Sequence, residues 1–277
     1  MTVEALQGRA VRGPSRRTDL SGVVMALFAA ILCLLIVLPI AWLLVFAVTD
    51  RAGNLTLANF SFTLFEYSST KDAIINTLEL GIVTATVGAA LVALLAYVTN
   101  RKLVIGHQVV AFLALAPVVI PGVVLAVALF IAYTRPPFVL YGTLAILFVA
   151  YLTKEMPVGY AQSDATFRSI PPDLEDAGRI LGAGRLRVLR DVTAPLARSG
   201  IIAAWCFIFI GVIRELSASI ILFTPTTKVM SVVIFDLKEE GQFGAIAVLG
   251  LIMLALTFAT VSIVQAALGR DVLGVKD

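Results

Sequence analysis

The chain has 277 residues, of which 60% are apolar and 14% are charged. Soluble domains carry about 45–50% apolar and about 25% charged residues. The composition therefore excludes an ordinary soluble fold and a disordered chain, and it favours a protein that crosses a membrane several times. The net charge of +3 is too small to indicate a nucleic-acid partner. Both cysteines, Cys33 and Cys206, lie in apolar runs, which predicts packing roles and neither a disulfide nor a metal site.

Six stretches of the sequence are long and apolar enough to span a membrane, which takes about 20 residues. The predicted spans are Val23–Val48, Ile74–Val98, Val109–Ala132, Phe138–Gly159, Ile201–Phe223 and Ala245–Leu268. The first is too long for a signal peptide, so we expect it to be retained. The predicted fold class is all-α: a polytopic membrane protein with six transmembrane helices in one domain, residues 21–277, behind a basic arm at residues 1–20.

The positive charges are distributed unequally between the two sides of this predicted bundle. Fourteen of the 21 Lys and Arg residues fall on the side of the basic arm, the 101–102 turn, the long loop after the fourth span and the C-terminal tail. Five fall in the loops on the other side. Because cytoplasmic loops carry the excess of Lys and Arg, both termini are predicted to be cytoplasmic. The basic arm is expected to be disordered or to lie on anionic lipid.

Prolines interrupt the third predicted span at Pro117 and at Pro121, which Gly122 follows. A proline inside a span frees backbone carbonyls and kinks the helix. Such breaks are tolerated where neighbouring protein or water satisfies the backbone. The pattern leaves two interpretations open: ordinary packing in the bundle, or a span that lines a pathway through the membrane.

The longest predicted cytoplasmic loop covers residues 160–199. Pro172 and the acids that follow it predict the start of a helix. An apolar stripe at helical spacing is formed by Leu174, Ala177 and Leu181. Gly182 predicts the end of this helix, and a second short basic helix, Arg185–Val192, is expected to stop at Pro195. Such an exposed amphipathic elbow has to dock either on its own bundle or on a separate cytoplasmic protein.

One spaced motif in this loop resembles a known family. The segment Asp176-Ala177-Gly178-x3-Gly182-x9-Val192-x-Ala194-Pro195 is similar to the EAA loop, EAA-x3-G-x9-I-x-LP, of the inner-membrane permeases of binding-protein-dependent ABC importers. The spacing fits at every position, and four positions depart conservatively. The resemblance covers roughly residues 70–268. It implies the type I importer fold, with cytoplasmic termini, in the inner membrane of a bacterium.

The resemblance also implies a function and partners. In that family the EAA loop forms a coupling helix that sits in a groove of the ATPase subunit. The chain is then a permease subunit, not an enzyme, that forms the pathway for a solute delivered by a secreted binding protein. The implied partners are a second permease copy or a sister permease, two cytoplasmic ATPase subunits, the binding protein and membrane lipid. The residues assigned to ATPase coupling are Glu175, Asp176, Ala177, Gly178, Gly182, Val192 and Pro195.

No nucleotide or other cofactor is expected on this chain. The sequence contains no G-x4-G-K-[ST] motif, so ATP would be used by the partner subunit.

Charged residues inside predicted spans are hypotheses for a functional site. Arg214 and Glu79 fall at overlapping depths, which predicts either a structural ion pair or a substrate vestibule lined by Arg214. The residues assigned to the substrate pathway are Glu79, Arg214, Glu215, Ser217 and Ser219. The sequence around Arg214 resembles permeases for ferric iron, phosphonates and other small anions, which implies a solute of that kind. A polyamine or another small organic solute is the alternative.

Other classes of protein have less support in the sequence. A secondary transporter is the main alternative, but such folds usually show inverted repeats, and none is visible. A channel would need a filter element, and none is legible. The single histidine, His107, is expected at a loop edge as a surface residue, and no metal cluster or catalytic pair indicates an intramembrane enzyme.

Overall fold

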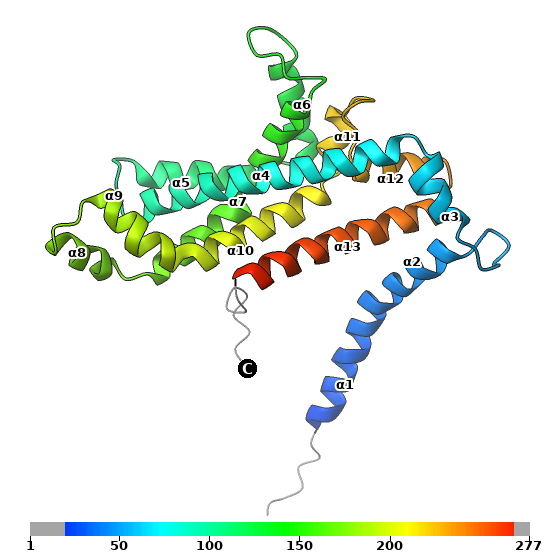
Figure 1. Ribbon diagram of the computed structural model, residues 1–277, viewed down its shortest axis with the longest axis horizontal. Helices are drawn as coiled ribbons and strands as arrows, with labels where there is room; N and C mark the ends of the chain where they lie inside the picture. Colours follow the sequence, from blue (N-terminus) through cyan, green and yellow to red (C-terminus); the bar gives the residue numbers. More distant parts are fainter. Residues whose placement is uncertain (1–19, 269–277) are drawn as a thin grey trace, which may run out of the picture. The chain divides into compact units, whose positions relative to one another are not determined.

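The computed structural model describes residues 20–268, which form a helical protein (Figure 1). Residues 1–19 of the predicted basic arm and the basic tail after Leu268 lie outside the described residues. The chain divides into two compact units, Met1–Val45 and Phe46–Asp277. Five described helices are long and apolar enough to cross a membrane, and a bent pair of helices brings the number to six. The prediction of an all-α protein with six spans is therefore confirmed.

The first unit contains one apolar helix that continues into the second unit. Its successive parts are α1 (Leu20–Leu32), the π-helical turn η2 (Cys33–Val37) and α2 (Leu38–Val48). This agrees with the predicted span Val23–Val48. The N–H of Leu38 bonds to the carbonyl of Cys33, so a widened turn comes directly before Pro39, which has no N–H to donate. Apolar residues occupy every side of the helix, as in a helix surrounded by lipid or by other spans.

Three long helices form the core of the second unit: α4 (Ser69–Asn100), α7 (Leu144–Ser169) and α10 (Ala194–Ile213). They pack on one another along their lengths, although α4 and α10 are far apart in the sequence. Phe209 and Tyr151 are among the largest fully buried side chains of this core. The spans that pack here therefore bury a common face and leave other faces apolar and exposed.

Glycines let these helices approach closely. A side chain on Gly81 would meet the ring of Phe209, and side chains on Gly88 and Gly159 would meet Ile208. Small residues at helix interfaces are a common way to pack helices in a membrane, because the helix backbones can then come into van der Waals contact.

One more long helix, α13 (Phe243–Leu268), belongs to the second unit. Shorter elements are α3 (Ala58–Ser61), η3 (Phe62–Glu66), α11 (Ser219–Leu222) and α12 (Met230–Glu239). A second apolar cluster joins α12 and α13 to the start of α4. The sixth predicted span, Ala245–Leu268, is confirmed by α13.

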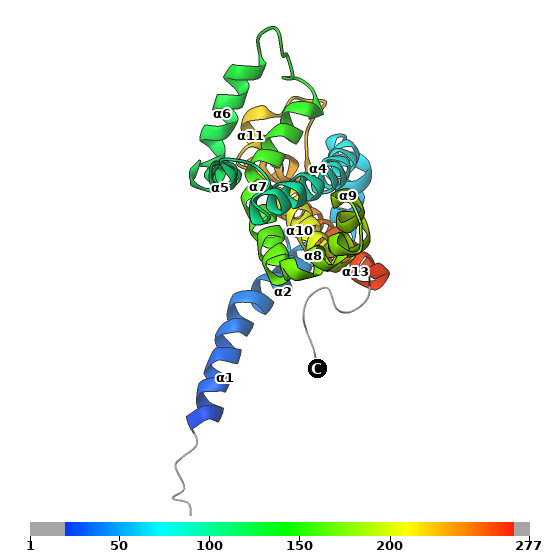
Figure 2. The ribbon, with the colours of Figure 1, turned by 90° about the vertical axis from the view of Figure 1, so that its left-hand side faces the viewer.

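The third predicted span is broken, not merely kinked. Its parts are α5 (His107–Leu115), the 3-10 turn η4 (Ala116–Val119) and α6 (Gly122–Tyr133). The two arms are bent by 109°, and Figure 2 shows α6 rising away from α5. Pro117 and Pro121 explain the break, because each lacks the N–H that would continue the helical ladder.

Two other predicted spans have different ends in the structure. The fourth, predicted as Phe138–Gly159, is α7, which begins at Leu144 after the capping hydroxyl of Thr143 and continues to Ser169. The long loop predicted to begin at residue 160 therefore begins ten residues later, at residue 170. Pro157 lies inside α7 without ending it.

The fifth span, predicted as Ile201–Phe223, ends early. Helix α10 stops at Ile213, and α11 is separate. The side chain of Glu215 accepts hydrogen bonds from the Ser217 hydroxyl at 2.6 Å and from the N–H of Ala218 at 2.9 Å. These local bonds replace the helical ladder after Ile213.

Candidate functional site

The predicted elbow consists of α8 (Pro172–Ile180), α9 (Arg185–Val188) and the π-helical turn η5 (Leu189–Thr193) (Figure 1). Pro172 occupies the first turn of α8, as predicted. The helix ends before Gly182, whose φ of +85° places it in the left-handed region. Glycine adopts this conformation without the strain that a Cβ would introduce.

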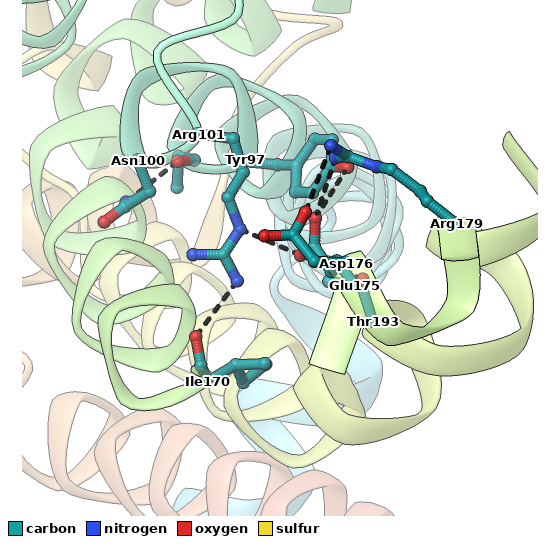
Figure 3. Close-up of polar contacts among 9 residues, drawn as sticks. Tyr97, Asn100, Arg101, Ile170, Glu175, Asp176, Arg179 and Thr193 are labelled. Atoms are coloured by element: carbon teal, nitrogen blue, oxygen red, sulfur yellow. Dashed lines mark hydrogen bonds and ion pairs between the residues drawn. The ribbon is translucent and has the colours of Figure 1, made fainter. Parts of the chain in front are cut away.

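Glu175 anchors the elbow to the core (Figure 3). Its carboxylate accepts hydrogen bonds from Arg101 Nε at 2.8 Å, from the Thr193 hydroxyl at 3.1 Å and from the Tyr97 hydroxyl at 3.5 Å. Arg101 also donates to the carbonyl of Ile170 at 3.0 Å. The exposed fraction of the Glu175 side chain is only 2% and that of Arg101 is 9%. One buried acid thus joins α8 to the end of α4 and to the turn that leads into α10.

The opposite face of the elbow is open. Its exposed apolar side chains are Leu174, Ile180, Leu181 and Leu186. Ala177 is also exposed, and the Asp176 side chain is 61% exposed, with Arg179 Nη1 at 3.3 Å from its carboxylate. We call these six residues the docking face: Leu174, Asp176, Ala177, Ile180, Leu181 and Leu186. The predicted apolar stripe is therefore exposed in the structure and does not pack on its own bundle.

Gly178 has a role that the sequence did not indicate. A Cβ at this position would meet Val188 at 3.1 Å, so the small residue allows α8 to pack on α9 within the elbow. Gly178 is one of the residues assigned to ATPase coupling, and the structure gives it this packing contact within the elbow.

The predicted end of the second elbow helix at Pro195 is wrong. The chain stays helical from Arg185 to Ile213. The N–H of Ala194 bonds to the carbonyl of Leu189, five residues back, so the widened turn η5 carries the helix past Pro195. Val192 is half-buried and Pro195 is exposed.

A second cluster of polar side chains lies between α7 and the segment after α10. Lys154 forms an ion pair with Glu215 and donates to the Ser217 hydroxyl at 2.7 Å. The backbone carbonyl of Glu215 accepts hydrogen bonds from Ser219 at 2.6 Å and from Ser231 at 2.7 Å. The sequence placed Glu215, Ser217 and Ser219 in one site, and in the structure both serines bond to Glu215, which pairs with Lys154.

The other two predicted pathway residues lie outside this cluster. Glu79 and Arg214 are both exposed, and the ion pairs found among residues 20–268 include none between them. Arg214 caps the end of α10, whereas the prediction placed it inside a continuous helical span. Ser219 is fully buried and bonds to the Tyr151 hydroxyl at 2.6 Å.

The sequence analysis gave no structural role to Asn76 and Thr77, two residues near the start of α4. Asn76 donates to the carbonyl of Lys228 at 2.9 Å, and the Thr77 hydroxyl accepts from the N–H of Met230 at 2.9 Å. These bonds hold the segment before α12 against α4. The signal available in the sequence was these two adjacent polar residues near the start of an apolar span. Within residues 20–268, no group of three or more His, Cys, Asp and Glu side chains is placed to hold a metal.

The sequence is similar to several permeases of known systems. It is 25% identical to the ferric transport system permease protein FbpB of Actinobacillus pleuropneumoniae, over 75% of this chain and 31% of that protein. It is 26% identical to the trehalose transport system permease protein SugB of Mycobacterium tuberculosis, over 74% and 78% of the two chains. It is 24% identical to the putative 2-aminoethylphosphonate permease PhnV of Salmonella typhimurium, over 79% and 84%. The chain thus spans about a third of the length of the ferric relative.

Solved structures show the same fold. A chain of a bacterial alginate ABC transporter, in complex with an alginate pentasaccharide-bound periplasmic protein, matches with a TM-score of 0.74 at 21% identity, over 92% of this chain and 96% of that one. A chain of the MetNI methionine ABC transporter in an inward-facing conformation matches with a TM-score of 0.54 at 22% identity, over 74% and 95%. The protein therefore has the type I ABC importer permease fold.

A family model supplies the assignment. The model for the binding-protein-dependent transport system inner membrane component matches residues 88–274, which is more than half of the chain and includes the whole elbow. The chain belongs to this family of ABC importer permeases.

Proposed function

We propose that the chain transmits the movement of a partner ATPase to the transport pathway through the elbow. The observation that carries the proposal is the pairing of an open docking face with a buried anchor, Glu175, in the same elbow. Because Glu175 binds Arg101 at the end of α4 and Thr193 before α10, a displacement of α8 is passed directly to two core helices. Such a rigid-body change can be driven by a partner that prefers one arrangement.

The proposed assembly contains two permease domains, two cytoplasmic ATPase subunits and a secreted binding protein in the bacterial inner membrane. The second permease is a further copy of this chain or a sister chain. The ATPase supplies ATP hydrolysis, and the apolar docking face with Asp176 is suited to a groove that carries basic groups. Membership of the family and the fold support this arrangement.

We propose ferric iron or a small anion, such as a phosphonate, as the solute. The ferric and phosphonate relatives support this choice, and the exposed guanidinium of Arg214 supplies positive potential. The trehalose relative supports the alternative of a small organic solute. If the solute is anionic, Arg214→Ala should reduce uptake of that solute more than uptake of a neutral one.

The coupling proposal is tested with proteoliposomes that contain the chain and its ATPase. Leu181→Asp should lower the amount of ATPase that co-purifies and should reduce ATP-driven uptake, while the bundle stays folded. Arg198→Ala, an exposed residue at the same end outside the docking face, is the matched control. Full uptake by Leu181→Asp with normal ATPase binding would overturn the proposal. Uptake without any ATPase subunit would instead establish the secondary-transporter alternative.

A further inference from the structure

A cavity lined mainly by polar and charged residues lies where the end of α4, the start of α5 and the last turns of α7 meet. Its volume is about 320 Å³. The lining residues are Thr99, Asn100, Lys102, His107, Gln108, Ala111, Tyr160, Asp164 and Arg168. None of them belongs to the docking face or to the Lys154–Glu215 cluster.

The charges around this cavity favour an anion. Its one acid, Asp164, is already held by Asn100 Nδ2 at 2.7 Å and by Arg168 Nε at 2.9 Å. Lys102 and His107 form none of the ion pairs found among residues 20–268. Because Arg168 is engaged by Asp164, Lys102 is the cation of the lining that these ion pairs leave over, and His107 lines the same cavity.

The backbone at Lys102 is also unusual. Its φ of +50° is the only positive value found at a non-glycine residue among residues 20–268. The N–H of Leu103 bonds to the carbonyl of Val98 at 3.0 Å, which makes Lys102 the residue after the helix cap, where glycine is usual. A lysine at this position carries a backbone cost that glycine avoids, and such outliers cluster at binding sites.

Exposed apolar residues adjoin the lining residues in the sequence. Leu103, Val104 and Ile105 follow Lys102 and are all exposed. On α5, Phe112 and Leu113 follow the lining residue Ala111 and are also exposed. A basic pocket beside an exposed apolar loop and helix face matches a ligand that has an anionic head and hydrocarbon chains.

We infer that this cavity binds the phosphate headgroup of an acidic phospholipid, with its acyl chains along the exposed face of α5. The headgroup is held by Lys102, with His107 as a further hydrogen-bond donor, while Arg168 in the same lining stays paired with Asp164 and offsets its charge. This site is separate from the proposed coupling function, because lipid binding can be measured without ATP or transport. The shared chemistry, a phosphate group, could also be supplied by free phosphate, so the test separates the two sources.

The test uses the full chain with its co-purified subunits, delipidated and inserted into phosphatidylcholine nanodiscs. Phosphatidylglycerol or inorganic phosphate is then titrated, and bound ligand is counted by native mass spectrometry. The parent should bind phosphatidylglycerol specifically, and Lys102→Gly with Arg168→Gln should weaken that binding about tenfold or more, since both cations near the headgroup are lost. Arg187→Gln with Arg198→Gln removes the same charge outside the cavity and should change binding less than about twofold.

Two results would overturn the inference. One is an equal loss of phosphatidylglycerol binding in the cavity variant and the control variant, which would show that the lipid responds only to general surface charge. The other is tight binding of inorganic phosphate with no additional gain from the lipid, which would assign the cavity to a free anion. If the double variant is unstable, Lys102→Gly alone decides, because it relaxes the backbone and should still weaken lipid binding about fivefold.

Discussion

The carboxylate of Glu175 lies 2.8 Å from Nε of Arg101, and both side chains are almost fully buried. This ion pair connects the elbow helix α8 to the last turn of α4. Because the rest of the exposed elbow makes few such contacts with the core, the pair fixes where the docking face is held.

Replacing Glu175 should destabilise the elbow and uncouple the transporter. Glu175→Ala leaves Arg101 buried without its partner, which costs about 3 kcal/mol or more. We expect a lower thermal unfolding temperature of the purified complex and a lower uptake per ATP hydrolysed. The double variant Glu175→Leu with Arg101→Leu should recover part of the stability, because no unpaired charge is left. Equal stability of the parent and Glu175→Ala would contradict the anchoring role.

Several features of the elbow could be predicted from local chemistry, whereas its anchor could not. Pro172 starts α8 and Gly182 follows its end because of the backbone conformations that these residues favour, so both ends of the helix were predicted correctly. The burial of Glu175 depends on Arg101, which is distant in the sequence, and no local pattern indicates that contact. The second elbow helix was expected to stop at Pro195, but it continues because the widened turn η5 comes directly before α10 and keeps the chain helical there.

The spans show the same contrast between local and distant information. Apolar length located all six, but the severity of the break at Pro117 and Pro121 depends on how α5 and α6 pack. The position of Arg214 was misjudged because Glu215 caps the following segment and ends α10 early. The ion pair predicted for Arg214 and Glu79 is not among those of residues 20–268, and the neighbouring Glu215 instead pairs with Lys154 of α7.

Two glycines of the elbow should respond differently to the same substitution. Gly182→Ala places a Cβ at a φ of +85° and should cost about 1 kcal/mol. Gly184→Ala is the matched control, because its φ of −68° and its empty surroundings accept a side chain. Chemical denaturation of the two purified variants measures the difference. If both lose the same stability, backbone strain at residue 182 does not shape the elbow.

Lys154, in the Lys154–Glu215 cluster, should matter for assembly of the complex, whereas Arg214, outside this cluster, should not. Lys154→Met leaves Glu215 buried without its cation and should cost about 2–3 kcal/mol. Adding Glu215→Gln should restore part of this loss. Arg214→Ala removes an exposed side chain and should leave the yield of folded complex near normal. Size-exclusion profiles of these variants measure the yield, and a large loss with Arg214→Ala would show that the guanidinium has a structural partner.

The orientation of the bundle can be tested at Asp176. Asp176→Cys places a thiol on an exposed position, whereas Gly178 lies partly beneath Val188 and is a poorer probe. The charge bias predicts that a membrane-impermeant maleimide labels this cysteine in inverted vesicles and not in intact cells. Arg135→Cys, in a predicted outer loop and exposed, should show the reverse pattern. Labelling of Asp176→Cys from outside would reverse the topology.

The docking face contacts the ATPase in the proposed assembly, and photo-crosslinking from position 181 tests this contact most directly. Leu181 is 87% exposed on the docking face, and Phe112, which is 68% exposed on α5, is the control position. A photoreactive residue at position 181 should form a covalent product with the ATPase subunit in cells, with a yield that changes when ATP hydrolysis is blocked. The same residue at position 112 should not form that product. Products from position 181 that contain only lipid or this chain, while the complex transports normally, would contradict the account.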